Sequence, residues 1–388
     1  MKKKIAILGS TGSIGKSTLD VIKRNKKNFN VVLLTANKNY KKLIQQAKDV
    51  KAKNVLINKK LFYDKVKKGL KNSSTKVHSG NISIKDIVKG KLDCTMVAIV
   101  GIAGLQPTLD AIKNSKSVAI ANKESIICGW NILLKEVKKN KTKIFPVDSE
   151  HFSIMELTKN VDDKEVEEII ITASGGPFLN FSKKRLKNVR PAQAIKHPNW
   201  SMGKKISVDS ANLMNKVFEV IEAYKLFRFD KKKYKIVIHP QSYVHSIIRY
   251  RSGLIKMILY NADMKIPISN ILNGKKNNAK YVKNINIHKL SKLSFQKVNS
   301  NQFPSVNLIE KSLKYGLLTP TIINAANEVL VDLFLSNKIG FLDIVNTINK
   351  IFKDKDFRKY ARRIPATIND IKTADNWARL KTNSICVR

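Results

Sequence analysis

The hydrophobic positions in the first part of the chain fall into short runs that alternate with longer amphipathic stretches. Lys16–Asn25 and Tyr40–Lys48 carry apolar residues at helical spacing, and each lies between two runs rich in β-branched residues. Repeated strand–helix–strand units of this kind predict an α/β fold with a parallel sheet covered on both faces. We expect its strands at Ile5–Leu8, Val31–Thr35, Asn54–Ile57, Thr95–Val100, Val118–Ala121 and Lys143–Val147.

The pattern changes twice further along the chain. From Asp148 to about Leu290 the periodicity is weaker and loops are more frequent, whereas the part from Pro304 onward is mainly helical. We therefore expect three regions, at 1–147, 148–290 and 304–388, with a linker at 291–303. In the last region, helices are expected at Val306–Tyr315, Pro320–Asn337, Phe341–Phe352 and Ile368–Lys381.

The chain of 388 residues has a formal charge of +45, from 74 basic and 29 acidic residues, which taken alone suggests nucleic-acid binding. Only 11 of the basic residues are arginines, whose planar guanidinium suits phosphate best, and the lysines are spread over every segment. We therefore favour lysine-rich codon usage over nucleic-acid binding as the cause. The charge would still concentrate anionic substrates around the protein.

The composition argues against several other classes. The chain is 43% hydrophobic and 27% charged, which is typical of a soluble globular protein. Its longest near-apolar run, Thr95–Leu105, is too short to cross a bilayer, and its lysine-rich start is unlike a secretory signal. Cys94, Cys128 and Cys386 are too widely spaced for a disulfide framework or a zinc site. We expect a cytoplasmic protein without a membrane or nucleic-acid partner.

A glycine-containing loop, Gly9-Ser10-Thr11-Gly12-Ser13-Ile14-Gly15-Lys16-Ser17, lies between the first strand and the first helix. Glycines there let the backbone approach a phosphate, which the N-terminal end of a helix attracts. Residues 10–17 match the P-loop pattern except for Ser10 at its first position, and the glycine spacing is one residue longer than the dinucleotide fingerprint. The loop alone leaves open a P-loop ATPase or kinase, a dinucleotide enzyme and a purely structural turn.

The end of the second strand favours a dinucleotide, and NADPH over NADH. An NAD site places an acidic residue there to bind the ribose hydroxyls, but this chain has Ala36-Asn37-Lys38-Asn39, with a base and no acid. A lysine suits the 2′-phosphate of NADPH. The P-loop alternative lacks a good second motif, because Pro146 interrupts the candidate strand Ile144–Asp148.

Two acidic side chains follow the strand that ends at Val147. Asp148 and Glu150 lie at the carboxyl end of this strand, where parallel sheets bind ligands. Two carboxylates two residues apart can converge on a hard cation such as Mg²⁺ or Mn²⁺. The same residues fit a helix N-cap equally well.

A second polar cluster is expected on a helix opened by Asp209 and Ser210. Asn215 and Lys216 precede Glu219 by four and three residues, so the three side chains share one helix face. Taken alone, this face is either a binding site or a solvated surface with a Lys–Glu pair.

Two segments between these clusters carry glycine, imidazole and indole groups. Ser174-Gly175-Gly176-Pro177-Phe178 can cradle an anion with its backbone N–H groups. His197-Pro198-Asn199-Trp200-Ser201-Met202-Gly203 belongs to a long segment with little periodicity, which is typical of a loop that closes over a site. Either segment could instead belong to the core.

Together these segments resemble the 1-deoxy-D-xylulose-5-phosphate reductoisomerase family of the non-mevalonate isoprenoid pathway. The matching blocks occur in order and cover most of the chain: GSTGSIGKSTLDV from Gly9, AIVGIAGLQPTLDAI from Ala98, ANKES from Ala121, PVDSEH from Pro146, SGGPF from Ser174, HPNWSMGKKISVDSANLMNK from His197, HPQS from His239 and NAANEV from Asn324.

The resemblance implies a homodimer of three-domain subunits. It implies a Rossmann-type NADPH domain at 1–147, a central α+β catalytic and dimerisation domain at 148–290 with a mobile loop at about 174–204, and a C-terminal helical bundle at 304–388. Asn37 stands where the family has glycine. The cofactor residues carry over to Thr11, Gly12, Ser13, Ile14, Asn37, Lys38, Asn39, Asn122, Glu124 and Gly203.

The resemblance also implies a divalent cation (Mg²⁺, Mn²⁺ or Co²⁺) held by Asp148, Glu150 and Glu219. The catalytic residues that it implies are Lys123, Glu150, His197 and Glu219. The substrate is a sugar phosphate, and its binding residues carry over to Lys123, Ser149, Glu150, Ser174, His197, Trp200, Ser210, Asn215, Lys216 and Glu219.

The reaction that the resemblance implies has two stages. A carbon–carbon bond of the metal-chelated substrate breaks and re-forms with a new partner, which gives a branched aldehyde phosphate. NADPH then reduces this aldehyde to 2-C-methyl-D-erythritol 4-phosphate. Lys123 and Glu150 are both candidates for moving protons, and Trp200 is expected to exclude water when its loop closes.

Overall fold

The structure is a computed structural model that describes residues 1–200, 202–274, 282 and 285–386. The chain forms two compact units, each described here by itself. Unit 1 comprises Met1–Ser125, Asn131–Phe152 and Asp263–Val282, and unit 2 comprises Ile126–Trp130, Ser153–Ala262 and Lys283–Arg388. Among the described residues, none of the helices combines the length and apolar character needed to cross a membrane.

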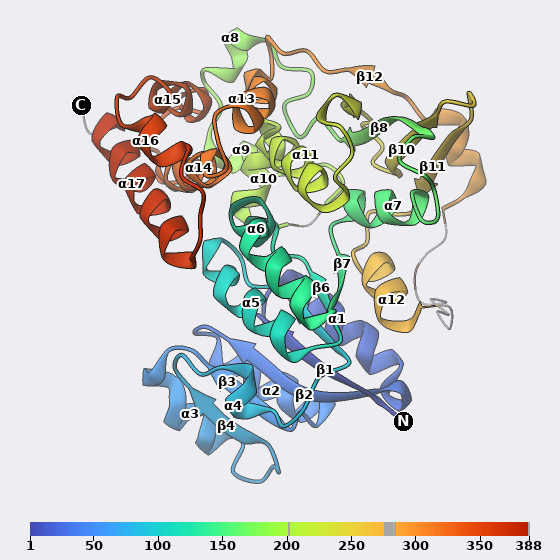
Figure 1. The fold of residues 1–388 in the computed structure, drawn as a ribbon, viewed down its shortest axis with the longest axis vertical. Coiled ribbons are helices and arrows are strands. Elements are labelled where there is room, and N and C mark those ends of the chain that lie inside the picture. Colours follow the sequence, from blue (N-terminus) through green and yellow to red (C-terminus); the bar gives the residue numbers. More distant parts are fainter. Residues whose placement is uncertain (201, 275–281, 283–284, 387–388) are drawn as a thin grey trace. The chain divides into compact units, whose positions relative to one another are not determined.

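Unit 1 is built on a seven-stranded sheet whose order is β4-β3-β2-β1-β5-β6-β7 (Figure 1). All neighbouring strands pair in parallel. The strand order reverses between β1 and β5, so loops leaving these two strands diverge and open the crevice where such sheets bind nucleotides. The strands are β1 (Lys3–Leu8), β2 (Phe29–Ala36), β3 (Asn54–Ile57), β4 (Lys76–Ser79), β5 (Cys94–Val97), β6 (Ser117–Ile120) and β7 (Lys143–Pro146).

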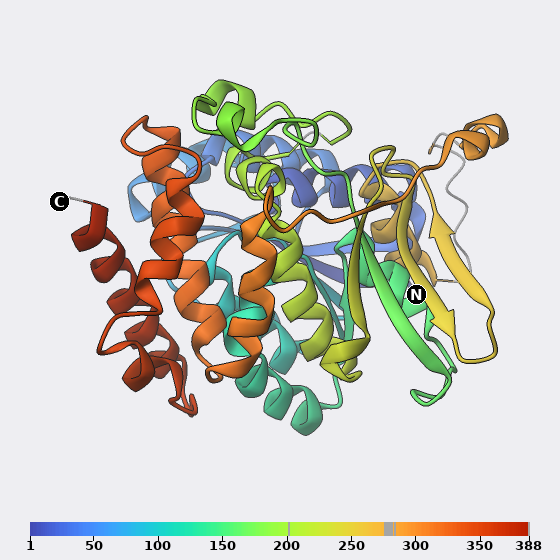
Figure 2. The same cartoon turned by 90° about the horizontal axis from the view of Figure 1, so that it is seen from above.

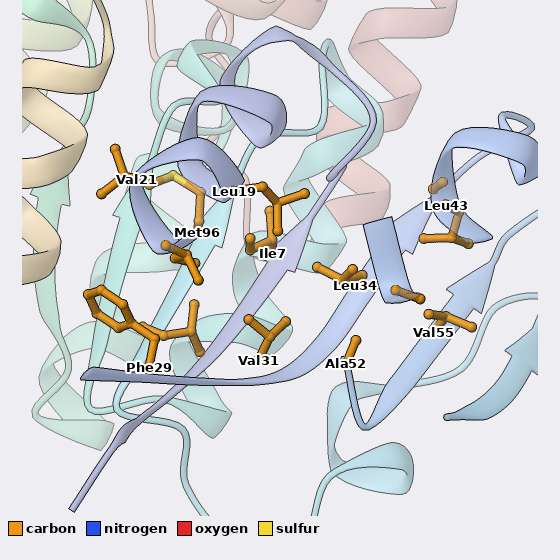
Figure 3. Close-up of a cluster of buried hydrophobic side chains, with 14 of the residues drawn as sticks. Ile7, Leu19, Val21, Phe29, Val31, Leu34, Leu43, Ala52, Val55 and Met96 are labelled. Atoms are coloured by element: carbon orange, nitrogen blue, oxygen red, sulfur yellow. The ribbon is translucent and has the colours of Figure 1, made fainter. Parts of the chain in front are cut away.

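The core of unit 1 forms because one stripe of α1 is apolar and meets an apolar sheet face. Leu19 of α1 lies beside Ile7 and Val21 lies beside Met96, within one cluster of buried residues (Figure 3). Burial of such side chains is the main favourable contribution to the stability of this layer. The helices of this part of the chain are α1 (Ser13–Arg24), α2 (Tyr40–Val50), α3 (Tyr63–Gly69), α4 (Ile84–Ile87), α5 (Leu105–Asn114), α6 (Lys123–Asn140), α7 (Ser149–Leu157) and α12 (Lys265–Asn273).

Unit 2 contains a five-stranded mixed sheet with the order β11-β10-β8-β9-β12. The β8–β9 pair is parallel, and the connection between these two strands contains four helices that carry many of the expected site residues. One of them, α11, packs Val220 and Ala223 against the sheet. These elements are β8 (Val166–Ala173), α8 (Lys183–Leu186), α9 (Pro191–Ala194), α10 (Lys204–Ala211), α11 (Met214–Phe227), β9 (Tyr234–Ile238), β10 (Val244–Tyr250), β11 (Ile255–Leu259) and β12 (Gln296–Lys297).

The C-terminal part of unit 2 is a bundle of helices, drawn in orange to red in Figures 1 and 2. Its central helix is α14, which contacts α13, α15, α16 and α17 and is buried on most sides. The bundle consists of α13 (Leu308–Lys314), α14 (Thr319–Leu335), α15 (Asp343–Ile351), α16 (Phe357–Ala361) and α17 (Ile368–Cys386). Short 3₁₀ helices lie at Lys26–Asn28, Lys60–Phe62, Ile102–Gly104, Lys231–Lys233, Ile287–Lys292 and Pro304–Asn307.

The structure confirms the expected α/β class, with a parallel sheet first and helices last. Two local expectations were wrong. Lys76–Ser79 forms an edge strand that its mixed sequence did not indicate, and Asp209 and Ser210 lie in the last turn of α10 instead of opening the next helix. The chain turns at Leu213, which is in the left-handed region (φ 60°), before α11 begins. The division into regions at 147, 290 and 303 stays a prediction.

The segment at about 174–204, expected as a mobile loop, contains the short helices α8 and α9. It also buries Phe178, Leu186 and Ala194, and the ring centroid of Phe178 lies 5.1 Å from that of Phe341 in the C-terminal part of unit 2. Its mobility stays a prediction, and Ser201 within it lies outside the described residues.

Candidate functional site

The glycine loop lies at the carboxyl end of β1, at the point where the strand order reverses. It is anchored to β2, because the backbone N–H groups of Gly9 and Ser10 donate to the side chain and carbonyl of Thr35. A Cβ at Gly15 would lie 2.5 Å from the Gly9 carbonyl oxygen, so the loop requires glycine there. The N-cap residue of α1 is Gly12, which has no side chain to cap the helix, so the first N–H groups and the positive dipole end suit a phosphate.

The exposed corner after β2 holds Asn37, Lys38 and Asn39. The Asn39 carboxamide accepts from the backbone N–H of Lys42, 3.2 Å away, and so caps α2. The Asn37 carbonyl oxygen accepts from the backbone N–H of Lys59 at 3.0 Å. The corner thus presents a lysine and amides, without an acidic residue, as a 2′-phosphate requires.

Asn122 ties two neighbouring loops of unit 1 together. Its buried side chain donates to the carbonyl oxygens of Ile99 (2.7 Å) and Gly101 (3.0 Å) and to the carboxylate of Glu124. Its own oxygen accepts from the backbone N–H of Ser125 and caps α6. In this arrangement Asn122 holds the loops after β5 and β6 together, and its contact with a cofactor stays a prediction.

Asp148 is the centre of a charged cluster between β7 and α7. The Lys123 ammonium lies 3.1 Å from one of its carboxylate oxygens, and Nδ1 of His151 lies 3.5 Å from the other. Burial disfavours the charged carboxylate, but the charge of Lys123 and the contact with His151 outweigh it and hold the pKa of Asp148 well below its usual range. Beside it, the Ser149 hydroxyl donates to the Glu150 carboxylate.

In unit 2, α11 brings together the three residues that its spacing predicts on one face. The Lys216 ammonium donates to the Glu219 carboxylate at 2.5 Å, and the Asn215 carboxamide donates to the other oxygen. The face is not a solvated surface, because the exposed fraction is 6% for Lys216 and 1% for Glu219. Burying a carboxylate costs solvation free energy even when an ammonium and an amide hold it, and such buried charges occur preferentially at binding and catalytic sites.

His197 and Ser174 form a second pair in unit 2, with the imidazole Nε2 2.9 Å from the hydroxyl oxygen. The imidazole Nδ1 accepts from the backbone N–H groups of Asn199 (3.1 Å) and Trp200 (3.0 Å). Because Nδ1 is an acceptor, the proton of a neutral imidazole lies on Nε2, which donates toward Ser174.

The Ser174–Phe178 loop packs directly on the end of α10. Gly176 has φ +66°, and a Cβ there would lie 2.8 Å from the Ser210 carbonyl oxygen. This close approach places the Ser174 and Ser210 segments against each other, although they are distant in the sequence. This role of Gly176 was not predicted, and the pair of adjacent glycines, Gly175 and Gly176, is the sequence signal that could have indicated it.

Trp200 contacts the sheet of unit 2. Its ring centroid lies 6.0 Å from that of His245, which in turn stacks on Tyr260 at 3.9 Å. Gly203 is the N-cap of α10, and among the described residues other than its chain neighbours, no atom lies within 4 Å of a Cβ built on it. The expected roles of Trp200 over a substrate and of Gly203 at a cofactor stay predictions.

The predicted residues therefore fall into two sets, one in each unit. Unit 1 contains Thr11, Gly12, Ser13, Ile14, Asn37, Lys38, Asn39, Asn122, Lys123, Glu124, Asp148, Ser149 and Glu150. Unit 2 contains Ser174, His197, Trp200, Gly203, Ser210, Asn215, Lys216 and Glu219. His151, for which no role was predicted, joins the first set through Asp148. Its position three residues after Asp148, at the start of a helix, is the signal that could have indicated this contact.

Comparison with known proteins agrees with the resemblance over nearly the whole chain. Residues 5–129 match the family described as 1-deoxy-D-xylulose 5-phosphate reductoisomerase, residues 144–227 its C-terminal domain, and residues 259–381 the DXP reductoisomerase C-terminal domain. The 1-deoxy-D-xylulose 5-phosphate reductoisomerase of Pelagibacter ubique is 47% identical over 387 residues, covering 99% of this chain and 100% of the relative.

Solved structures of reductoisomerases also match this chain over nearly its whole length. The Zymomonas mobilis 1-deoxy-D-xylulose 5-phosphate reductoisomerase in complex with NADPH has a TM-score of 0.92 and 37% identity, covering 100% of this chain and 99% of that one. A DOX-P reductoisomerase in complex with NADPH, fosmidomycin and magnesium has a TM-score of 0.93 and 31% identity, covering 99% and 98%. By sequence and by fold, this chain belongs to the 1-deoxy-D-xylulose 5-phosphate reductoisomerase family.

Proposed function

We propose that this chain converts 1-deoxy-D-xylulose 5-phosphate to 2-C-methyl-D-erythritol 4-phosphate, with NADPH as reductant and a divalent cation as Lewis acid. The observation that carries the proposal is full-length similarity to reductoisomerases, including one in complex with NADPH, fosmidomycin and magnesium. The side chains needed for each part of this chemistry are present in the two sets of residues described above.

The residues of unit 1 fit NADPH. The uncapped start of α1 and the loop formed by Thr11, Gly12, Ser13 and Ile14 suit the pyrophosphate, and Lys38 suits the 2′-phosphate. The cofactor supplies hydride when it is bound. The protein contributes the crevice at the β1–β5 reversal, whose walls are fixed by the hydrogen bonds of Asn122.

The carboxylates fit a hard divalent cation such as Mg²⁺, Mn²⁺ or Co²⁺. We assign its ligands to Asp148, Glu150 and Glu219, on the family pattern and on the preference of such ions for carboxylate oxygen. When bound, the cation would polarise oxygens of the substrate. The low pKa of Asp148 keeps its carboxylate ionised, as a metal ligand must be.

The polar groups of unit 2 fit the phosphate of the substrate. Ser174 and Ser210 offer hydroxyls on two segments that pack against each other at Gly176. Asn215 and Lys216 offer an amide and an ammonium on α11. Binding the remote phosphate this way would orient the reacting carbons, which is how non-reacting groups contribute to catalysis.

Protons must move on and off the substrate hydroxyls during the rearrangement. Lys123 and Glu150 are the candidates in unit 1, and the Lys123 ammonium is held by Asp148 at 3.1 Å. His197 is suited to donate a hydrogen bond from Nε2 and not to act as a cation. Burial, and then the nearby charge of Lys216, lower the pKa of His197 from 6.5 to about 4.

The function is tested by the loss of NADPH absorbance with purified protein, 1-deoxy-D-xylulose 5-phosphate and Mg²⁺, with and without EDTA. We expect substrate-dependent oxidation that EDTA abolishes.

Glu219→Gln should lower kcat/KM at least about a hundredfold, since it removes a ligand charge, and should leave NADPH affinity unchanged. Glu167→Gln, an exposed change on β8, is the control. Loss of NADPH binding in Glu219→Gln would contradict the metal assignment.

Lys38→Ala tests the preference for NADPH. Removal of an ammonium that pairs with the 2′-phosphate should weaken NADPH binding about tenfold, whereas NADH, which lacks this phosphate, should bind as before. Lys41→Ala removes the same charge from the exposed start of α2 and controls for the general positive field. Equal losses for the two nucleotides in Lys38→Ala would overturn the assignment.

His197 makes stability depend on pH in a defined window. Its pKa is about 4 in the fold and near 6.5 in the unfolded chain, so between these values only the unfolded chain binds the proton. The contribution of His197 to stability is present above pH 6.5 and is lost as pH falls toward 4. Acidification from pH 7.5 to 5 should therefore lower the Tm of the wild type more than that of His197→Gln. Equal decreases would contradict the low pKa.

We also infer that the protein is a cytoplasmic homodimer. The edge strand β11 and the residue before it expose apolar side chains, with Leu254 62% and Ile255 55% exposed. An apolar edge strand tends to pair with another chain. Ile255→Asp should therefore shift the mass measured by light scattering toward the monomer, whereas Leu61→Asp, at another exposed apolar site, should not. A monomeric wild type would refute the dimer.

A further inference from the structure

Helix α14 has a polar side that the proposed function leaves unexplained. The NAANEV block places Asn324 and Asn327 there, and both side chains are completely buried within unit 2. Burying an amide costs solvation free energy, which its hydrogen bonds offset, and the carboxamide nitrogen of each asparagine donates one such bond. The partners of these two asparagines therefore indicate what the block does.

Asn327 binds the helix that carries Ser210. Its carboxamide nitrogen donates to Oδ1 of Asp209 at 2.8 Å, and Asp209 is only 1% exposed. The other oxygen, Oδ2, lies 2.8 Å from the ammonium of Lys205, one turn earlier on α10. Both oxygens of the buried carboxylate are thus held, one by its own helix and one by α14.

Asp209 is adjacent to Ser210, in the last turn of α10. The chain then turns sharply through Leu213 into α11, which carries Asn215 and Lys216. A second residue from the C-terminal part of the chain holds this turn, since the Ser305 hydroxyl donates to the Asn212 carbonyl oxygen at 2.5 Å. The phosphate-binding groups that we assigned to α10 and α11 therefore depend on contacts from outside the catalytic segment.

We propose that Asn327 is a positioning residue for the substrate phosphate. By holding Asp209 it fixes the rotation of the last turn of α10 and so the direction of the Ser210 hydroxyl. The inference rests on the proposed function, because it concerns the phosphate of the proposed substrate. Loss of a contact that the enzyme makes equally with the bound substrate and with the transition state raises KM and leaves kcat unchanged.

Asn324 provides a matched comparison on the same helix. Its carboxamide nitrogen donates to the Glu328 carboxylate at 3.1 Å, and Glu328 also pairs with Arg379 of α17. Each asparagine thus donates to a carboxylate that also has a basic partner. The two asparagines differ in the helix that they contact. Asn327 donates to a residue of α10, whereas Asn324 donates to a residue of its own helix, α14.

The test compares Asn327→Leu with Asn324→Leu in the full-length protein loaded with Mg²⁺ and NADPH. We expect Asn327→Leu to raise the KM for 1-deoxy-D-xylulose 5-phosphate about tenfold, with kcat changed less than about threefold and the KM for NADPH unchanged. Asn324→Leu should leave all three values near those of the wild type, even if its Tm falls. Equal KM increases in both variants, or an equal increase for NADPH, would overturn the inference.

A charge exchange keeps the proposal testable if Asn327→Leu does not fold. Asn327→Asp places a second carboxylate against Asp209 and should raise the substrate KM. The double variant Asp209→Asn/Asn327→Asp exchanges the two groups, so that the amide at position 209 can donate to the carboxylate at position 327. We expect the double variant to recover a KM within about threefold of the wild type. A double variant no better than Asn327→Asp would refute the role. A wild type without turnover would refute the proposed function itself, and this inference with it.

Discussion

A parallel sheet brings the carboxyl ends of all its strands to one edge, and the chemistry of unit 1 depends on this constraint. The glycine loop after β1, the Lys38 corner after β2, Asn122 after β6 and Asp148 after β7 come from segments spread over more than a hundred residues. Strand pairing alone places them along one edge. The apolar contacts of α1 with β1 and β2 keep the strands paired, so the core determines where the polar groups lie.

In unit 2 the constraint is different, because polar groups hold the site from within. Glu219 is buried against Lys216, and Asp209 is buried against Lys205 and Asn327. Each buried carboxylate costs solvation energy and needs its own donors in place. The tight turn at Leu213 and the close contact of Gly176 with the Ser210 carbonyl bring these groups near one another. In unit 2 the positions of the polar site residues thus depend on local charge pairs, whereas in unit 1 they depend on where the strands end.

Much of this could be predicted from the sequence, for physical reasons that differ between elements. Buried parallel strands leave continuous apolar runs, so β1, β2 and β3 were found, whereas the edge strand β4 has a mixed pattern and was missed. The i, i+3 and i, i+4 spacing correctly placed Lys216 and Asn215 beside Glu219, but it cannot tell a buried face from a solvated one. Asn327 and Asp209 are 118 residues apart, so no local pattern could have joined them.

The most direct test of the account is the fate of the reductant's hydrogen. With deuterium at the transferred position of NADPH, the protein, Mg²⁺ and 1-deoxy-D-xylulose 5-phosphate should give 2-C-methyl-D-erythritol 4-phosphate that carries one deuterium on the carbon of the former aldehyde. NMR and mass spectrometry of the product measure both the branched skeleton and the label. Unlabelled product, or a labelled product with an unbranched chain, would contradict the proposed rearrangement and reduction.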